Sequence, residues 1–471
     1  MSDLTLHLVA LRKVMAEFPP LESHAPKTPI ELADIYFPKS HAAALDPDRS
    51  LIIGNRGMGK SFWASALVNQ DSRQRIAEAL PEARLAHSDI DVRFGFAEGE
   101  GAVGISRDEL ASFVRAENTV EQIWRAVTLP HIAQLAGREI PGRFQDRLSW
   151  VANEPGETRE IMRAADARLA ETKGKLVFVF DQLEQLSDDH ELRSELTKGI
   201  LRLALAFKSY RGLRVKIFMR PDHFADNRLF SFPDASKVRG EALQLDWRGI
   251  DLYGLLYSRL LRGAPTAFSA VARAAGVALG RATDLPISLT TSEENQHKVF
   301  DIIAGEAMGV RRKRGLPYTW LVSHLADARN QVSPRTFLRA LYFAAGHQPV
   351  PPDNAIDHLG IHEGVRRASE NRVDDLKEDY PWVPQKLYAL RGLLVPCLPE
   401  EMIAKWESAT LPDTEMDYPS VLESMADIGV IEIRRTTGKV DVPDIFRLPA
   451  GIKRKGGITQ QQRRKVRVST S

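Results

Sequence analysis

Residues 54–61 combine three glycines with a lysine and a serine hydroxyl. In chain order they are Gly54, Asn55, Arg56, Gly57, Met58, Gly59, Lys60 and Ser61. This is the full spacing of a phosphate-binding loop, in which backbone N–H groups point at a β-phosphate from the start of a helix. The glycines permit the unusual backbone angles, Lys60 adds a charge for the β and γ phosphates, and Ser61 offers its hydroxyl to Mg²⁺. The alternative is a chance glycine-rich turn.

An acidic residue, Asp181, follows the apolar run Leu176–Phe180. Ligands bind at the carboxyl ends of buried parallel strands, so Asp181 is predicted to hold Mg²⁺ together with Ser61. Gln182 occupies the place where a catalytic acid often follows directly. Glu184, three residues after Asp181, is therefore the candidate to orient or deprotonate an attacking water, and the alternative is that it only decorates a helical turn.

Two arginines are candidates to reach the γ-phosphate. Arg220 follows the apolar run Val215–Met219, and its alternative role is an ion pair with Asp222 or Asp181. Arg335 lies in the first turn of a helix that is predicted from a serine cap followed by proline. An arginine at a helix start opposes the helix dipole, which favours a phosphate or an acidic partner nearby, with a salt bridge as the alternative.

These residues require a core in which strands and helices alternate, and residues 46–248 have that pattern. We expect an α/β fold, a P-loop NTPase core with a doubly wound parallel sheet. The predicted strands are Leu51–Ile53, Ala83–Ala86, Leu176–Phe180 and Val215–Met219. Phe62 opens the helix after the loop and completes the predicted nucleotide-binding set. The segment between Lys60 and Asp181 is longer than a compact core needs, which predicts an insertion around residues 87–160.

The rest of the chain divides by composition and period. The predicted parts are an N-terminal helix with a polar segment over residues 1–45, the core over 46–248, a helical lid over 249–347, a helical linker region over 348–398, a winged-helix-like domain over 399–452 and a basic flexible tail over 453–471. In the winged-helix-like part, Asp417 caps a helix that ends at Gly429, and residues 430–434 and 439–442 flank a turn.

The composition excludes several classes of protein. With 471 residues, 43% of them hydrophobic, the chain is long enough for roughly two to four domains. The net charge of +2 gives no overall field that demands a polyanionic partner. A single cysteine, Cys397, cannot form an intrachain disulfide or a cysteine-based metal site, and no stretch reaches about 18 uncharged apolar residues. We therefore expect a cytoplasmic protein with no membrane span and no metal beyond Mg²⁺.

Taken together and in this order, the motifs resemble the P-loop ATPases of the AAA+ and STAND group, in particular the origin-recognition-like branch with a winged helix behind its lid. The matched positions are Lys60 and Ser61 for Walker A, Asp181 for Walker B, Arg220 for sensor 1 and Arg335 for sensor 2. Sensor 1 in many AAA+ proteins is a polar amide, whereas Arg220 is similar to the arginine that ends this strand in STAND switches. The resemblance implies ATP and Mg²⁺ as cofactors, and a homo-oligomer or a partner protein.

Three functions remain open from the sequence. The leading hypothesis is an ATP-hydrolysing switch or motor that acts on a partner protein or DNA. The alternative is a DNA-binding or adaptor protein that holds ATP or ADP as a structural ligand with little hydrolysis, and a kinase is third. Residues 453–467 contain seven basic residues and no acidic one, which favours DNA contact through the tail and the winged helix, although a basic terminus is often only a solvated tail.

Overall fold

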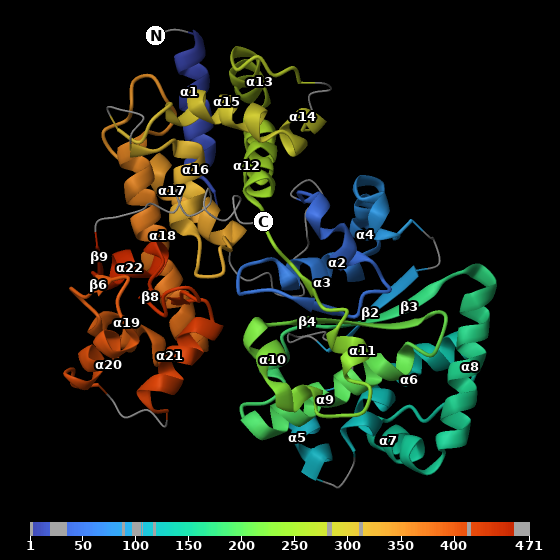
Figure 1. Cartoon of the computed structure of the whole chain (residues 1–471). Coiled ribbons are helices and arrows are strands. Elements are labelled where there is room, and N and C mark those ends of the chain that lie inside the picture. The colour runs from blue at the N-terminus through green and yellow to red at the C-terminus, as the bar shows by residue number, and fades with distance from the viewer. Residues whose placement is uncertain are drawn as a thin grey trace. The chain divides into compact units, whose positions relative to one another are not determined.

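The computed structural model describes residues 3–18, 35–86, 90–96, 105, 107–115, 119–279, 285–309, 314–411 and 416–455. The chain forms two compact units, one of residues Leu21–Asp246 and one that joins Met1–Pro20 to Trp247–Ser471. Figure 1 shows the elements of both, and each unit is described by itself.

The first unit is built on a five-stranded parallel sheet. Its strand order is β2 (Ile90–Phe96), β3 (Lys175–Phe180), β4 (Leu213–Met219), β1 (Leu51–Ile53) and β5 (Leu243–Gln244). Helices α2, α3 and α4 lie on one face and α6, α8 and α9 on the other (Figure 1). The prediction of a doubly wound P-loop α/β fold is therefore confirmed.

The helices of this unit connect the strands. They are α2 (Ala42–Leu45), α3 (Lys60–Val68), α4 (Gln70–Ala79), α5 (Arg107–Arg115), α6 (Val120–Ala136), α7 (Phe144–Asn153), α8 (Pro155–Thr172), α9 (His190–Phe207), α10 (Pro221–Ala225) and α11 (Ser236–Arg239). Short 3-10 turns add η2 (Lys39–His41), η3 (Pro81–Ala83), η4 (Leu183–Gln185) and η5 (Asn227–Phe230). The predicted insertion around residues 87–160 covers β2 and α5 to α7; β2 is part of the sheet, and the insertion itself stays a prediction.

Three of the four predicted strands are present, and the prediction of a strand at Ala83–Ala86 is wrong. The segment Ala83–Ala86 is not a strand, because Pro81 starts the turn η3 and Arg84 has a φ of +53°, which is incompatible with an extended backbone. The strand lies further along the chain, at Ile90–Phe96. Strand β5, with two residues, was not predicted.

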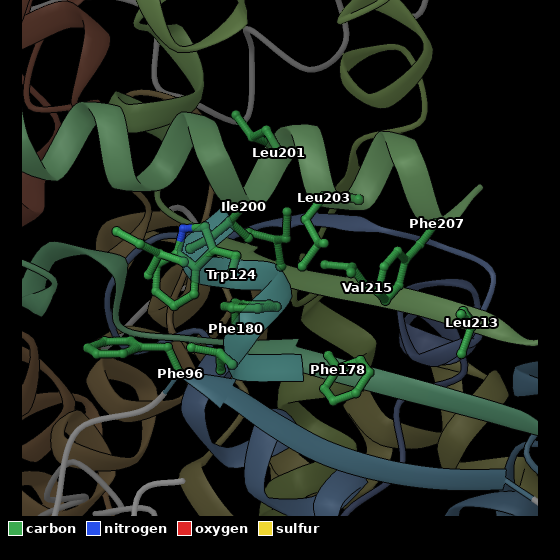
Figure 2. Packing of buried hydrophobic residues seen from close by; sticks show 14 of the residues in the cluster. Phe96, Trp124, Phe178, Phe180, Ile200, Leu201, Leu203, Phe207, Leu213 and Val215 are labelled. Carbon is green, nitrogen blue, oxygen red and sulfur yellow. The ribbon is translucent and has the colours of Figure 1, made fainter. Parts of the chain in front are cut away.

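Aromatic and aliphatic side chains fill the space between the sheet and α9. Figure 2 shows Ile200, Leu203 and Phe207 of α9 pointing towards the strands, which is the spacing of one helix face. Trp124 of α6 packs edge-on against Phe180, with ring centroids 5.4 Å apart, and its Nε1 donates a hydrogen bond of 2.9 Å to the Leu196 carbonyl. This core holds β3, and hence its carboxyl end, in place.

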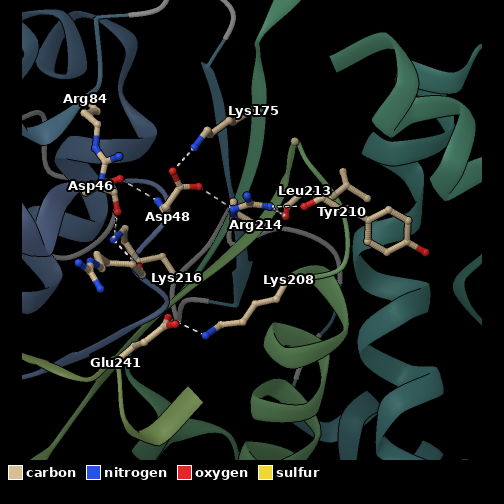
Figure 3. A network of polar contacts seen from close by, with 12 residues as sticks. Asp46, Asp48, Arg84, Lys175, Lys208, Tyr210, Leu213, Arg214, Lys216 and Glu241 are labelled. Atoms are coloured by element: carbon tan, nitrogen blue, oxygen red, sulfur yellow. Dashed lines mark hydrogen bonds and ion pairs between the residues drawn. The ribbon is translucent and has the colours of Figure 1, made fainter. Parts of the chain in front are cut away.

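A polar network fixes the opposite, amino ends of the strands (Figure 3). Lys216 of β4 is 1% exposed, and its Nζ donates to the carbonyls of Ala44, Asp46 and Arg49 at 2.8 to 2.9 Å. Burial lowers the pKa of Lys216 to about 7. All three donors of the ammonium group are therefore used to hold the segment before β1 against the sheet.

The second unit is mostly helical. Its helices are α1 (Asp3–Ala16), α12 (Gly249–Gly263), α13 (Pro265–Ala274), α14 (Ile287–Thr291), α15 (Glu293–Ala304), α16 (Pro317–Leu325), α17 (Pro334–Gly346), α18 (His358–Asp379), α19 (Val383–Ala389), α20 (Pro399–Glu407), α21 (Tyr418–Asp427) and α22 (Asp444–Ala450). Arg12 of α1 donates to the carbonyl of Ala355 at 2.9 Å and to that of His347. The N-terminal helix thus packs within the helical unit.

The C-terminal part of this unit adds four short strands: β6 (Leu394–Val395), β7 (Glu432–Ile433), β8 (Val440–Asp441) and β9 (Lys453–Arg454). The side chain of Asp417 accepts from the Ser420 N–H at the start of α21, and Gly429 follows the helix with a φ of +79°. Strands β7 and β8 pair antiparallel. The helix and hairpin predicted from residue 417 to 442 are present, whereas most of the predicted basic tail, residues 456–471, lies outside the described residues.

Candidate nucleotide-binding site

The loop between β1 and α3 has the backbone of a phosphate-binding turn. Gly57 and Gly59 have φ values of +83° and +95°, a region that side-chain-bearing residues rarely adopt. The Gly54 N–H donates to the Met219 carbonyl at 3.1 Å, which ties the start of the loop to the end of β4. The residue at the start of α3, Gly59, has no side chain that could cap the helix, and a helix start of this kind is where a phosphate-binding loop holds its anion.

Lys60 lies over this loop. Its Nζ donates to the carbonyls of Gly54 at 2.8 Å and Asn55 at 3.2 Å. Burial lowers the pKa of Lys60, while the nearby carboxylates of Glu184 and Asp181 act in the opposite direction. The ammonium group is thus positioned over the loop and surrounded by the acidic residues that the sequence singled out.

Asp181 and Ser61 meet, as the sequence predicts for a Mg²⁺ pair. Asp181 is 2% exposed at the end of β3, and its carboxylate lies beside the Ser61 side chain. Burial raises the pKa of Asp181 to about 6, although Ser61 and Lys60 favour the ionised form. Its Oδ1 has no hydrogen-bond partner in the described part of the chain. A buried carboxylate oxygen without a partner, beside a hydroxyl, fits a hard divalent cation such as Mg²⁺.

Glu184 faces the same place. It lies half-buried in the turn η4, which follows Gln182 with its φ of +55°. The charge of Glu184 acts on Lys60, Asp181 and His223, so this carboxylate belongs electrostatically to the site. Its role in activating water stays a prediction.

Arg220 has the ion pair that the sequence offered as its alternative role. The side chain is 10% exposed, and Nε donates to Asp222 Oδ1 at 3.3 Å. Arg220 also contributes to lowering the pKa of Lys60, which places both cations in one electrostatic environment.

Arg335 belongs to the helical unit. It follows Pro334 in the first turn of α17, and the capping serine, Ser333, accepts from the Thr336 N–H as the sequence predicts. Its approach to the phosphates stays a prediction.

The remaining loop residues support the turn. Asn55 and Met58 are buried, and Arg56 and Phe62 are half-buried. The ring of Phe62 packs edge-on against Trp63, with centroids 5.1 Å apart.

Sequence reasoning missed two histidines. His41 Nδ1 accepts from Trp63 Nε1 at 3.1 Å, so its Nε2 carries the proton and donates to the Asp246 carbonyl at 3.0 Å. His223 lies half-buried in the first turns of α10, and burial lowers its pKa while Asp222 opposes this effect. The sequence offers one signal that His223 belongs to the site, namely its position three residues after Arg220.

Comparisons with known proteins add structural similarities at low identity. No family model matches the chain, and no curated protein sequence matches it. The Walker-type ATPase PABY2304 of Pyrococcus abyssi is similar over 89% of this chain and 99% of its own, with 12% identity and a TM-score of 0.41. The Aeropyrum pernix ORC1 protein in complex with DNA is similar over 93% and 96%, with 14% identity and a TM-score of 0.33. CDC6p from Pyrobaculum aerophilum is similar over 85% and 86%, with 13% identity and a TM-score of 0.30.

These similarities include proteins of the origin-recognition group that the sequence resembles. The core is a P-loop α/β fold. The order of the five strands and the left-handed glycines of the loop are those of this fold. Among the described helices, none is long and apolar enough to cross a membrane.

Proposed function

We propose that the chain binds and hydrolyses Mg·ATP and acts as a nucleotide-dependent switch or motor of the AAA+/STAND type. The observation that carries this proposal is the pair of Ser61 and Asp181, which lie next to each other beside Lys60, with one buried carboxylate oxygen without a partner. A loop that merely turned the chain would have no reason to bury an acid at this position.

Each group has a role that follows from its chemistry. The N–H groups at the start of α3 and the Lys60 ammonium bind the phosphates, and Ser61 and Asp181 hold Mg²⁺. When bound, Mg²⁺ neutralises charge on the phosphate oxygens. Glu184 orients the attacking water or accepts its proton, and Arg220 stabilises charge on the γ-phosphate after leaving Asp222.

The helical unit supplies the moving part in this proposal. Arg335 at the start of α17 senses the γ-phosphate, and the elements from α20 to β8 form a winged helix that contacts a partner protein or DNA. Assembly into a homo-oligomer and a cytoplasmic location complete the proposal. The helix and hairpin around Asp417 and Gly429 support the winged helix.

A second candidate is a DNA-binding or adaptor protein that retains ATP or ADP without hydrolysis. One observation favours it. The residue next to Asp181 is Gln182 and not an acid, and the nearest carboxylate after it, Glu184, lies in the following turn η4. The two candidates differ in turnover and share nucleotide binding.

The test measures nucleotide affinity and phosphate release for the wild type, Lys60→Ala and Asp181→Ala. Lys198→Ala is the matched control, since this lysine lies on α9 and is absent from the site. We expect Lys60→Ala to lose affinity and turnover, Asp181→Ala to lose turnover, and the control to keep both. Equal turnover in all four proteins would reject an active site here, and tight binding without release by the wild type would select the adaptor.

A further inference from the structure

A guanidinium group holds together the segment that follows β4. Arg239, the last residue of α11, is half-buried, with its Cζ 5.3 Å from the ring centroid of Phe224 and 4.8 Å from that of Phe230. The two rings meet edge-on, with centroids 5.6 Å apart. The Nη1 of Arg239 also donates to Asn227 Oδ1 at 2.8 Å. Arg239 therefore joins α11 to both α10 and η5, and we call it, with the two rings, the arginine clamp.

The helix that bears Arg239 is itself fixed to the core. Val238, next to Arg239, is fully buried and belongs to the hydrophobic cluster of the first unit. Lys208, at the end of α9, donates from Nζ to the Lys237 carbonyl and to Glu241 Oε2, both at 2.6 Å, and Figure 3 shows the contact with Glu241. These contacts lie on either side of Arg239 in the chain, so its backbone has a fixed position.

Helix α10, by contrast, depends on contacts that its side chains make. It has five residues, and a helix that short does not persist in water without tertiary contacts. Pro221 is buried at its start, and Phe224, one turn later, is the residue that Arg239 holds. The Phe224 N–H donates to the Arg220 carbonyl at 3.0 Å, and Arg239 Nη2 donates to the Phe224 carbonyl at the long distance of 3.5 Å. The clamp therefore acts on the turn that links Arg220 to α10.

The same turn governs the side chain of Arg220. The backbone of Arg220 follows β4 directly, and β4 lies between β3 and β1, so strand pairing fixes it. The side chain pairs instead with Asp222, whose position depends on α10. A fixed Asp222 aims the guanidinium in the resting site and is unable to follow it towards a phosphate. If α10 were loose, Asp222 would move with Arg220 and compete with the phosphate for it.

We propose that Arg239 is a positioning residue for Arg220, on which it acts through Phe224, α10 and Asp222. The inference rests on the proposed function, because it takes Arg220 as the group that stabilises charge on the γ-phosphate. Arg239 itself touches no reacting atom. Its loss should therefore slow the chemical step and leave ATP affinity nearly unchanged, since the loop and Lys60 bind the phosphates.

The first experiment measures kcat and KM for ATP in Arg239→Ala, Arg220→Ala and the double variant. We expect Arg239→Ala to lower kcat by about 10- to 100-fold, as a misplacement of about 1 Å does, and to change KM by less than about threefold. The double variant should be no slower than Arg220→Ala, because a residue that acts through Arg220 then has nothing left to position. Arg239→Lys keeps the charge but loses the planar group between the rings, so it should regain part of kcat.

Arg202→Ala is the matched control. Arg202 of α9 lies over the ring of Phe232, with its Cζ 5.6 Å from the ring centroid. The substitution thus removes the same kind of contact from the segment between β4 and β5 and leaves the contacts of α10 in place. Its kcat should stay at the wild-type value even where its melting temperature falls as far as that of Arg239→Ala.

Amide hydrogen exchange tests the clamp without nucleotide. The N–H groups of Phe224 and Asp226 are bonded to carbonyls one turn before them. In Arg239→Ala they should exchange on the order of 10 times faster than in the wild type, because the contacts that hold α10 closed are lost. In Arg202→Ala they should exchange at the wild-type rate. Arg239→Lys, with a smaller increase, replaces Arg239→Ala in both experiments if that variant does not fold.

Three results would overturn the proposal: unchanged exchange in α10, equal losses of kcat in Arg239→Ala and Arg202→Ala, or a double variant slower than Arg220→Ala by the full factor of Arg239→Ala. Recovery of turnover on mixing Arg239→Ala with Lys60→Ala would also overturn it, because Arg239 would then act on the site of another copy. A wild type that releases no phosphate, together with faster exchange of α10 in Arg239→Ala, would reject the proposed function and leave the hold of Arg239 on α10 standing.

Discussion

The buried carboxylate of Asp181 is expected to lower the free energy of unfolding, although the proposed Mg²⁺ site needs its negative charge. Burial raises its pKa from 3.8 to about 6, a difference of about 2 units. One unit corresponds to about 1.4 kcal/mol, so the ionised form destabilises the folded unit by about 3 kcal/mol at neutral pH. Asp181→Asn keeps the shape and an oxygen acceptor for Ser61 and removes the charge. We expect this substitution to stabilise the protein in the absence of nucleotide and metal.

The stability gained by Asp181→Asn should depend on pH. Below pH 3.8 the aspartate is protonated in both the folded and unfolded chains, and the substitution should have little effect. Between pH 3.8 and about 6 the folded chain holds a proton that the unfolded chain has lost, so the free energy of unfolding of the wild type falls as pH rises. The full difference is present above pH 6. Groups distant from Asp181 titrate alike in both proteins and cancel, whereas the substitution also removes a charge that raises the pKa of Lys60.

Urea unfolding in EDTA, at a series of pH values from 4.5 to 8, measures this difference on the transition of the first unit. Asp188→Asn is the matched control, because the Asp188 side chain is 98% exposed. A control gain equal to that of Asp181→Asn would contradict the reasoning, as would a gain independent of pH or a loss of stability at pH 7. Mg·ATP at about 1,000 times its Kd should reverse the order, since a ligand at that concentration adds about 4.1 kcal/mol to the protein that binds it.

Three further substitutions test the scaffold of the site. Gly59→Ala meets no atom closer than 3.8 Å but keeps a φ of +95°, so it should lower stability by about 1 to 3 kcal/mol and weaken ATP binding in a titration. Lys216→Met leaves three buried carbonyls without a donor and should lower the free energy of unfolding by about 3 kcal/mol or more, measured in urea. Trp124→Phe removes the hydrogen bond to the Leu196 carbonyl and should lower it by about 2 kcal/mol, with Trp150→Phe as the less buried control.

The parts of the site that the sequence predicts are those fixed by local spacing. The positive φ angles of the loop demand glycine, so Gly57 and Gly59 signal the turn directly. Strand β3 is apolar after its first residue, Lys175, because parallel strands are buried on both faces, and the next polar residue, Asp181, marks the end of the strand. The Arg220 pair with Asp222 is also local, because only Pro221 lies between the two residues in the sequence.

The features that the sequence does not predict depend on distant partners or on single backbone angles. His41 contacts Trp63, 22 positions away, and Asp246, 205 positions away, and no pattern around His41 signals either contact. Lys216 lies in a strand that, apart from Arg214, is otherwise apolar, and its three carbonyl partners precede it by about 170 positions. The strand wrongly expected at Ala83–Ala86 fails because Arg84 turns left-handed, which composition does not reveal.

The charged groups of the site have partners within the chain that a nucleotide would have to replace. Lys60 donates to the carbonyls of Gly54 and Asn55, Arg220 to Asp222, and Ser61 is joined to Asp181. Binding of a triphosphate is therefore an exchange of hydrogen bonds, so its net free energy is smaller than the sum of the new contacts. If Arg220 contacts the γ-phosphate as proposed, its pair with Asp222 in the first turn of α10 has to change. Because α10 begins directly after β4, occupancy of the phosphate site would then change the charge balance at the start of a neighbouring helix, which is the kind of local change from which a nucleotide switch is built.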